Sequence, residues 1–206
     1  MQLRTRVDGG GSPRPAKWGI DSEYGRLRDL LIGPIDNYHW TPGNAVAQRS
    51  ERLGLAFDSE VVRAQYEEMI AAYEEADVNV YQIPAETGLP YQVYARDSSV
   101  MTPWGAIIMQ MEKPFRRGEY AAVLRFYLEH GIPIYDIVSA GNVEGGDFMV
   151  LKPGVAICGY SGERSIEPAV NQLKNWFVAE GWEFMTYAFD PHFLHLDVQM
   201  LSLIHI

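Results

Sequence analysis

The most constraining feature of this chain is a recurring order of predicted elements: two adjacent strands, a helix and a further strand. Strands are expected at 99–102, 106–110 and 133–138, and again at 148–151, 155–158 and 182–187. The helices between them are expected at 118–130 and 167–180, where Gly131 and Gly181 provide stop signals. A repeat of this size favours an α/β fold arranged as a closed radial array over an open doubly wound sheet.

The remaining elements are placed from the same patterns. A strand at 26–32 precedes an irregular stretch at 36–55, which we expect to be a long loop. Asp58 and Ser59 are candidate caps for a helix that leads to a strand at 78–83. A last strand is expected at 196–200, so every predicted strand belongs to one alternating series.

Composition limits both architecture and partners. The 206 residues, 47% of them hydrophobic, favour a single domain, which we place at 21–200 after a polar, Gly- and Pro-rich lead-in at 1–20. A net charge of −10 argues against nucleic acid, and no apolar run is long enough to cross a bilayer. Cys158 has no second cysteine to pair with, so a cytoplasmic location is expected.

The last six residues are expected to be foreign to the natural sequence. Residues 201–206 correspond to the in-frame translation of a transposon-end sequencing adapter. We therefore expect the natural reading frame to break near Met200 and give His205 no role. The alternative is a natural C-terminal strand.

Three short polar motifs interrupt the apolar runs and carry candidate chemistry. They are Arg96-Asp97, the Glu144–Asp147 segment with its two glycines, and His195-Leu196-Asp197. On a strand, His195 and Asp197 would project from the same face. Each motif alone has an ordinary structural explanation: a surface ion pair, an acidic turn and a buried histidine satisfied by an acid.

Together, and in this order, the motifs resemble the guanidino-group modifying superfamily of arginine deiminases, dimethylarginine dimethylaminohydrolases and amidinotransferases. The resemblance extends from about Tyr24 to Met200 and includes two arginine-bearing segments, 115–119 and 159–165. It implies a pentein-like, pseudo-five-fold α/β propeller that is incomplete at the C-terminus, which agrees with the radial array expected from the repeat.

The resemblance also implies a role for each residue. Asp97 and Asp197 would bind a guanidinium, which carboxylates recognise through paired hydrogen bonds. His195 would protonate the leaving amine and then activate water, and Glu144 would orient His195. A substrate carboxylate would be bound by Arg164 and by Arg116 or Arg117. Asp147 and Arg96 would contact these residues without contacting the substrate.

One part of the family pattern is missing. The family's nucleophilic cysteine lies well beyond the His-x-Asp motif, whereas Cys158 precedes Arg164 inside an apolar run and is expected to be a core residue. We therefore expect the 206-residue chain to be truncated before its nucleophile and inactive, and its parent to hydrolyse a guanidino C–N bond. Amidino transfer is the alternative, although Glu144 favours a hydrolase. A non-catalytic guanidine-binding module is a third reading.

A metal hydrolase remains a separate alternative. Its ligands would come from His192, His195, Asp197, Glu144 and Asp147. Their spacing matches no strong metal motif, and nearby arginines would oppose a cation, so we expect neither a metal nor another cofactor. The expected partner is a small guanidino compound, with no nucleic acid or membrane, and an acidic propeller with an aromatic surface is compatible with a homo-oligomer.

Overall fold

The computed structural model describes residues 18–40, 45–55 and 57–200, with side chains from 48 onward in the second range. Most of the expected lead-in at 1–20 and the whole adapter-like segment at 201–206 lie outside the described residues. The chain divides into two compact units. Of the described residues, the smaller unit comprises those between 27 and 94, and the larger unit comprises 18–26 and 95–200.

The smaller unit contains a two-stranded parallel sheet. Its strands are β1 (Asp29–Ile32) and β2 (Asn79–Gln82), and its helices are α1 (Ala45–Arg52) and α2 (Ser59–Glu75). Asp58 caps α2 as expected, because its Oδ1 accepts hydrogen bonds from the backbone N–H groups of residues 60 and 61. The expectation of a continuous loop at 36–55 was wrong, since α1 forms within it.

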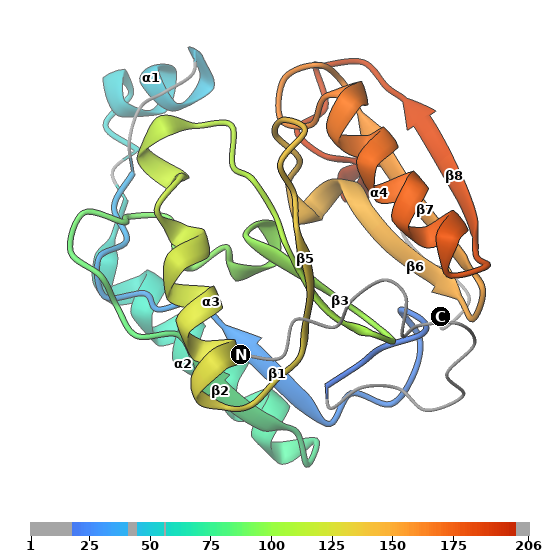
Figure 1. The fold of residues 1–206 in the computed structure, drawn as a ribbon. Helices are drawn as coiled ribbons and strands as arrows, with labels where there is room; N and C mark the ends of the chain where they lie inside the picture. Colours follow the sequence, from blue (N-terminus) through green and yellow to red (C-terminus); the bar gives the residue numbers. More distant parts are fainter. Residues whose placement is uncertain (1–17, 41–44, 56, 201–206) are drawn as a thin grey trace. The chain divides into compact units, whose positions relative to one another are not determined.

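The larger unit repeats one design twice (Figure 1). In each copy an antiparallel strand pair is followed by a helix, and the next strand then pairs in parallel with the second strand of the pair. The first copy comprises β3 (Ser99–Thr102), β4 (Gly105–Ile108), α3 (Glu119–Glu129) and β5 (Ile134–Ile137). The second comprises β6 (Phe148–Lys152), β7 (Val155–Tyr160), α4 (Glu167–Ala179) and β8 (Glu183–Ala188). These bounds confirm the predicted order of elements.

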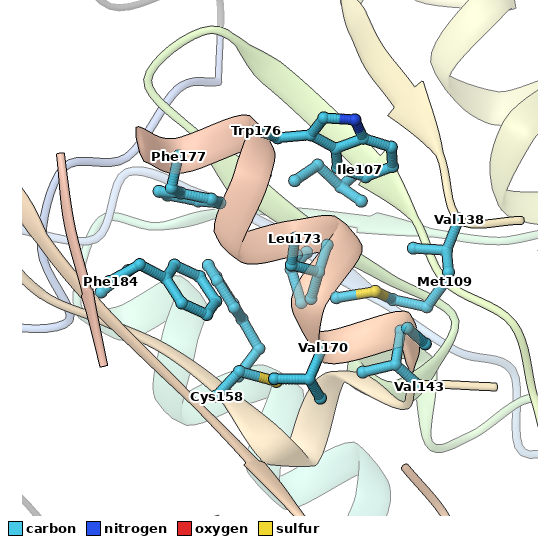
Figure 2. Packing of buried hydrophobic residues seen from close by; sticks show 14 of the residues in the cluster. Ile107, Met109, Val138, Val143, Cys158, Val170, Leu173, Trp176, Phe177 and Phe184 are labelled. Carbon is cyan, nitrogen blue, oxygen red and sulfur yellow. The ribbon is translucent and has the colours of Figure 1, made fainter. Parts of the chain in front are cut away.

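The core of the larger unit is built around α4. Val170, Leu173, Trp176 and Phe177 of this helix are buried, and they pack with apolar side chains from the strands (Figure 2). Each large apolar side chain removed from water in this way contributes on the order of 2 kcal/mol. Cys158 of β7 lies in the same cluster with no exposed surface, which confirms that it is a core residue.

The sheets differ from two expectations. The strand expected at 196–200 is wrong, because residues 196–198 form a 3-10 turn, η4 (Leu196–Val198). The α/β class is confirmed, but the described residues form three separate sheets and no closed one. Within the described part of the chain, no helix is both long and apolar enough to span a membrane.

Candidate active site

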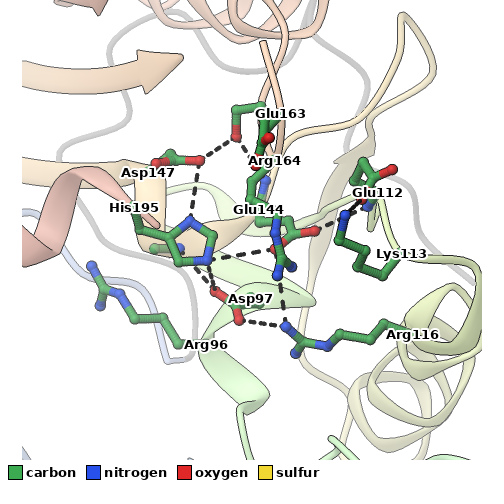
Figure 3. Close-up of polar contacts among 12 residues, drawn as sticks. Arg96, Asp97, Glu112, Lys113, Arg116, Glu144, Asp147, Glu163, Arg164 and His195 are labelled. Atoms are coloured by element: carbon green, nitrogen blue, oxygen red, sulfur yellow. Dashed lines mark hydrogen bonds and ion pairs between the residues drawn. The ribbon is translucent and has the colours of Figure 1, made fainter. Parts of the chain in front are cut away.

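The three polar motifs meet in the larger unit, each in or immediately before a short 3-10 turn. Asp97 ends η1 (Ala95–Asp97) one residue before β3, and Glu144 immediately precedes η3 (Gly145–Asp147), which leads directly into β6. His195 immediately precedes η4. Its Nε2 lies 3.5 Å from Glu144 Oε2 and 3.7 Å from Asp97 Oδ1 (Figure 3). Three segments far apart in the sequence therefore supply one buried cluster.

The glycine pair explains how these turns approach one another so closely. A Cβ on Gly145 would lie 1.9 Å from the Arg96 carbonyl oxygen, and one on Gly146 would lie 2.8 Å from His195 Cγ. The Gly146 N–H also donates a 3.2 Å hydrogen bond to Asp97 Oδ1. Side chains at these two positions would separate the turns, so glycine is required here for packing.

Carboxylates surround the His195 imidazole. Nδ1 lies 3.3 Å from Asp147 Oδ2, while Asp147 Oδ1 accepts a 2.9 Å hydrogen bond from the Leu196 N–H. Burial, the largest single influence, lowers the pKa of His195. The contact with Asp147 and the charges of Asp97, Asp147 and Glu144 outweigh burial and raise that pKa above its usual value. The environment therefore favours the imidazolium form.

Glu144 is fully buried at the centre of the cluster. Its Oε1 accepts a 3.0 Å hydrogen bond from the Glu112 N–H, and its Oε2 accepts one of 3.2 Å from Arg164 Nη1. Burial raises the pKa of Glu144, and the Glu112 N–H and Arg164 oppose that rise. Arg164 is therefore at the site, as expected, with its guanidinium next to a carboxylate.

Arg116 and Arg117 have different surroundings. Arg116 is buried, and its Nε and Nη2 each donate a 2.9 Å hydrogen bond to Glu119, while its Nη1 donates one of the same length to Asp97 Oδ2. Arg117 is exposed and donates to the Glu112 backbone oxygen. Because two carboxylates already occupy the Arg116 guanidinium, its expected role in binding a substrate carboxylate stays a prediction without direct support.

Asp197 lies at the edge of the cluster. The expectation that His195 and Asp197 project together from a strand was wrong, because η4 turns the chain between them. The His195 side chain is 7% exposed, whereas that of Asp197 is 35% exposed and lies 3.7 Å from Arg96 Nε. Arg96 also donates to the Phe148 carbonyl oxygen, so it links η1 to the start of β6.

Two buried residues at the site had not been predicted. Glu119 pairs with Arg116 three positions earlier, a spacing that could have indicated the contact. Ser165 contacts both Glu144 and Asp147, and nothing in the sequence distinguishes it from other loop serines.

The cluster also has ligand types suited to a metal. Side-chain atoms of Asp97, Glu144 and His195 lie within 4.8 Å of one another. Arg116 and Arg164, however, approach Glu144 Oε2 at 3.9 and 3.2 Å, and their charges would oppose a cation. Exposed His192, part of the alternative metal set, is not in this group. We therefore assign no metal to the site.

Comparison with known proteins is consistent with this geometry. The sequence profile of a family described as arginine deiminase matches residues 43–198. The chain belongs to the arginine deiminase family. Membership of the guanidino-group modifying superfamily, inferred above from the three motifs, is thereby confirmed. The family match covers all the residues of the cluster described above.

Individual relatives share sequence or fold with this chain. Uncharacterized protein YkgA of Bacillus subtilis is 29% identical over 181 residues, which cover 85% of this chain and 59% of YkgA. A crystal structure of dimethylarginine dimethylaminohydrolase aligns with this chain with a TM-score of 0.69 and 20% identity. The alignment covers 87% of this chain and 67% of the chain in that structure. SxtG, an amidinotransferase from Microseira wollei, has a TM-score of 0.63 at 12% identity, covering 82% and 63%. The structures support a shared fold, and this chain spans about three fifths of the length of YkgA.

Proposed function

We propose that this chain is the larger part of a hydrolase that cleaves a guanidino C–N bond of arginine or a related compound. The observation that carries this proposal is the convergence of Asp97, Glu144 and His195 in one buried cluster. Carboxylates beside a histidine of raised pKa suit a planar cation that must be bound and then protonated on its leaving nitrogen.

The proposed reaction follows from these positions. Asp97 and Glu144, with Asp197 at the edge, bind the guanidinium, and a thiolate attacks its central carbon. His195 donates its proton to the departing amine, which leaves an amidino-thioether. The neutral imidazole then takes a proton from water and hydroxide adds to the same carbon. The thiolate departs and the added hydroxyl loses its proton, which gives the ureido product. Arg164 is the best placed arginine to bind a substrate carboxylate.

We propose that the attacking thiol comes from outside these 206 residues. Cys158 is the only cysteine in the sequence, and it is buried in the core of the larger unit. Burial, followed by the charge of Asp147, raises the pKa of this thiol well above its usual value, which disfavours the reactive thiolate. The 206-residue chain is accordingly expected to be inactive. The complete protein would close its repeats into a five-fold α/β propeller.

Amidino transfer is the second candidate because the structural relatives include an amidinotransferase. Both reactions share the thioether, and they differ in whether water or an amine resolves it. Release of ammonia or an alkylamine, with formation of a ureido product and no added acceptor, would identify the hydrolase.

The proposal can be tested in two steps. Sequencing the source DNA beyond the Met200 codon should reveal a cysteine in an apolar C-terminal segment, and a stop codon directly after Ile206 would contradict the thiol mechanism. The parent protein is then assayed for amine release from arginine and methylated arginines. His195→Gln should lower turnover by at least about a hundredfold, whereas His192→Gln, at an exposed histidine three positions away, should not. Equal turnover in the two variants would refute the role of His195.

A further inference from the structure

Ser165 is a buried serine in the turn between β7 and α4, and its backbone is held firmly in place. The Gly162 N–H donates to the Ser165 carbonyl oxygen at 3.0 Å, and the Ile166 N–H donates to the Asn142 carbonyl oxygen at 3.1 Å. The Asn142 side-chain amide donates to the Arg164 carbonyl oxygen at 2.9 Å. Ser165 has no exposed surface, so its hydroxyl can bond only to protein groups.

The Ser165 hydroxyl connects Asp147 of η3 with Glu144, the residue that precedes η3. Its Oγ accepts a 3.1 Å hydrogen bond from the Glu144 N–H and donates one of 2.5 Å to Asp147 Oδ2. A hydroxyl carries a single proton. Since the contact with Glu144 uses an oxygen lone pair, that proton is committed to Asp147, in a short hydrogen bond to a carboxylate.

Asp147 in turn faces the imidazole. Its Oδ1 is held by the Leu196 N–H, and its Oδ2 receives the Ser165 proton while lying 3.3 Å from His195 Nδ1. Nδ1 is buried, and no group among the described residues meets full hydrogen-bond geometry with it, so the Asp147 carboxylate at 3.3 Å is its charged neighbour. Asp147 is thus the acceptor within reach of a proton on Nδ1. With the proton on Nδ1, the unprotonated Nε2 of the neutral ring faces Asp97 and Glu144.

We propose that Ser165 is a positioning residue: its hydroxyl holds the Asp147 carboxylate against His195 Nδ1 and thereby keeps the unprotonated nitrogen of the neutral ring at Nε2. This inference rests on the proposed function, because Nε2 is the atom that would exchange protons with the leaving amine and water. Ser165 itself touches no reacting atom and acts through Asp147.

A purely structural role for Ser165 makes a different prediction. If the hydroxyl only tied the β7–α4 turn to η3, its loss would lower stability and leave the imidazole unchanged. The discriminating readout is therefore the tautomer of His195, followed by long-range proton–nitrogen NMR of the histidine rings. His195→Gln identifies the His195 signals by their loss.

The test compares variants of the 206-residue chain. In the wild type the neutral His195 ring is expected to carry its proton on Nδ1. Ser165→Ala should shift the ring toward a mixture of tautomers and move its titration to lower pH, because Asp147 is held less firmly beside Nδ1. Ser165→Thr retains the hydroxyl and should restore the wild-type spectrum. Ser161→Ala removes a hydroxyl of the same segment that accepts a hydrogen bond from the Glu163 N–H and not from the cluster, and it should leave the His195 tautomer and titration unchanged.

The outcomes separate this inference from the proposed function. Unchanged tautomer and titration in Ser165→Ala would overturn the positioning role, whether or not the parent protein turns over guanidines. Where the alanine variant does not fold, Ser165→Cys keeps the side-chain volume with only a weak donor and should show the same change. In an active parent, Ser165→Ala should lower kcat about tenfold with little change in KM. A change in KM with kcat unaltered would contradict the positioning role.

Discussion

Removal of the Glu119 carboxylate should be among the most destabilising changes available in the larger unit. Both its oxygens accept 2.9 Å hydrogen bonds from Arg116, and the two side chains are only 2% and 6% exposed. Glu119→Ala leaves the buried Arg116 guanidinium with the Asp97 contact but without its bidentate partner. Breaking a buried pair from one side typically costs about 3–5 kcal/mol, a large share of the roughly 5–15 kcal/mol that stabilise a whole domain.

Urea unfolding followed by tryptophan fluorescence would measure this loss, since Trp104 and Trp176 lie in the core of the same unit. With a slope of about 2 kcal/mol per molar urea, the midpoint should fall by roughly 2 M. The matched control is Glu129→Ala, the same chemical change at an exposed position at the other end of α3, which should cost no more than about 0.5 kcal/mol.

The isosteric variant sharpens the test. Glu119→Gln keeps the packing and one acceptor for Arg116, so its loss of stability should lie between those of Glu119→Ala and Glu129→Ala. If Glu119→Ala unfolds at the same urea concentration as Glu129→Ala, the buried pair does not stabilise the unit and the reasoning fails.

Three further results are expected. His195 should titrate above about pH 6.5 by NMR, and Asp97→Asn should lower its pKa. Because the folded-state pKa is raised, the stability that His195 contributes is complete below about pH 6.5 and is lost as pH rises through the raised value. The folded 206-residue chain should not react with thiol reagents until it unfolds, since Cys158 is buried, and fast labelling of the folded chain would contradict that burial. Gly146→Ala should displace the His195 ring, seen as a changed ring spectrum in a folded protein, because the new methyl group would lie 2.8 Å from Cγ.

The helices and strands of the larger unit could be predicted because their signals are local. The ends of α3 and α4 follow from apolar spacing and from Gly131 and Gly181, which have φ values of 62° and 80°. The three site motifs could also be identified, since acidic and histidine residues beside apolar runs are visible in sequence.

What could not be predicted depends on contacts between distant segments. Residues 196–198 are apolar enough for a strand but form η4, where the Leu196 N–H bonds Asp147 instead of a neighbouring strand. Burial of Arg116 depends on Asp97 as well as on Glu119, and the role of Ser165 depends on η3. The sequence therefore identifies the charged residues, and only the tertiary structure shows which of them are paired with another side chain.

The three 3-10 turns of the site have one more consequence. Asp97, Asp147 and Asp197 recur at equal intervals along the chain, and η3 contacts both η1 and η4. Asp97 pairs with buried Arg116, Asp147 faces His195 Nδ1, and Asp197 is partly exposed beside Arg96. A chimera that exchanges a whole repeat would carry its aspartate along with the turn that positions it, whereas a crossover inside a repeat would separate the two.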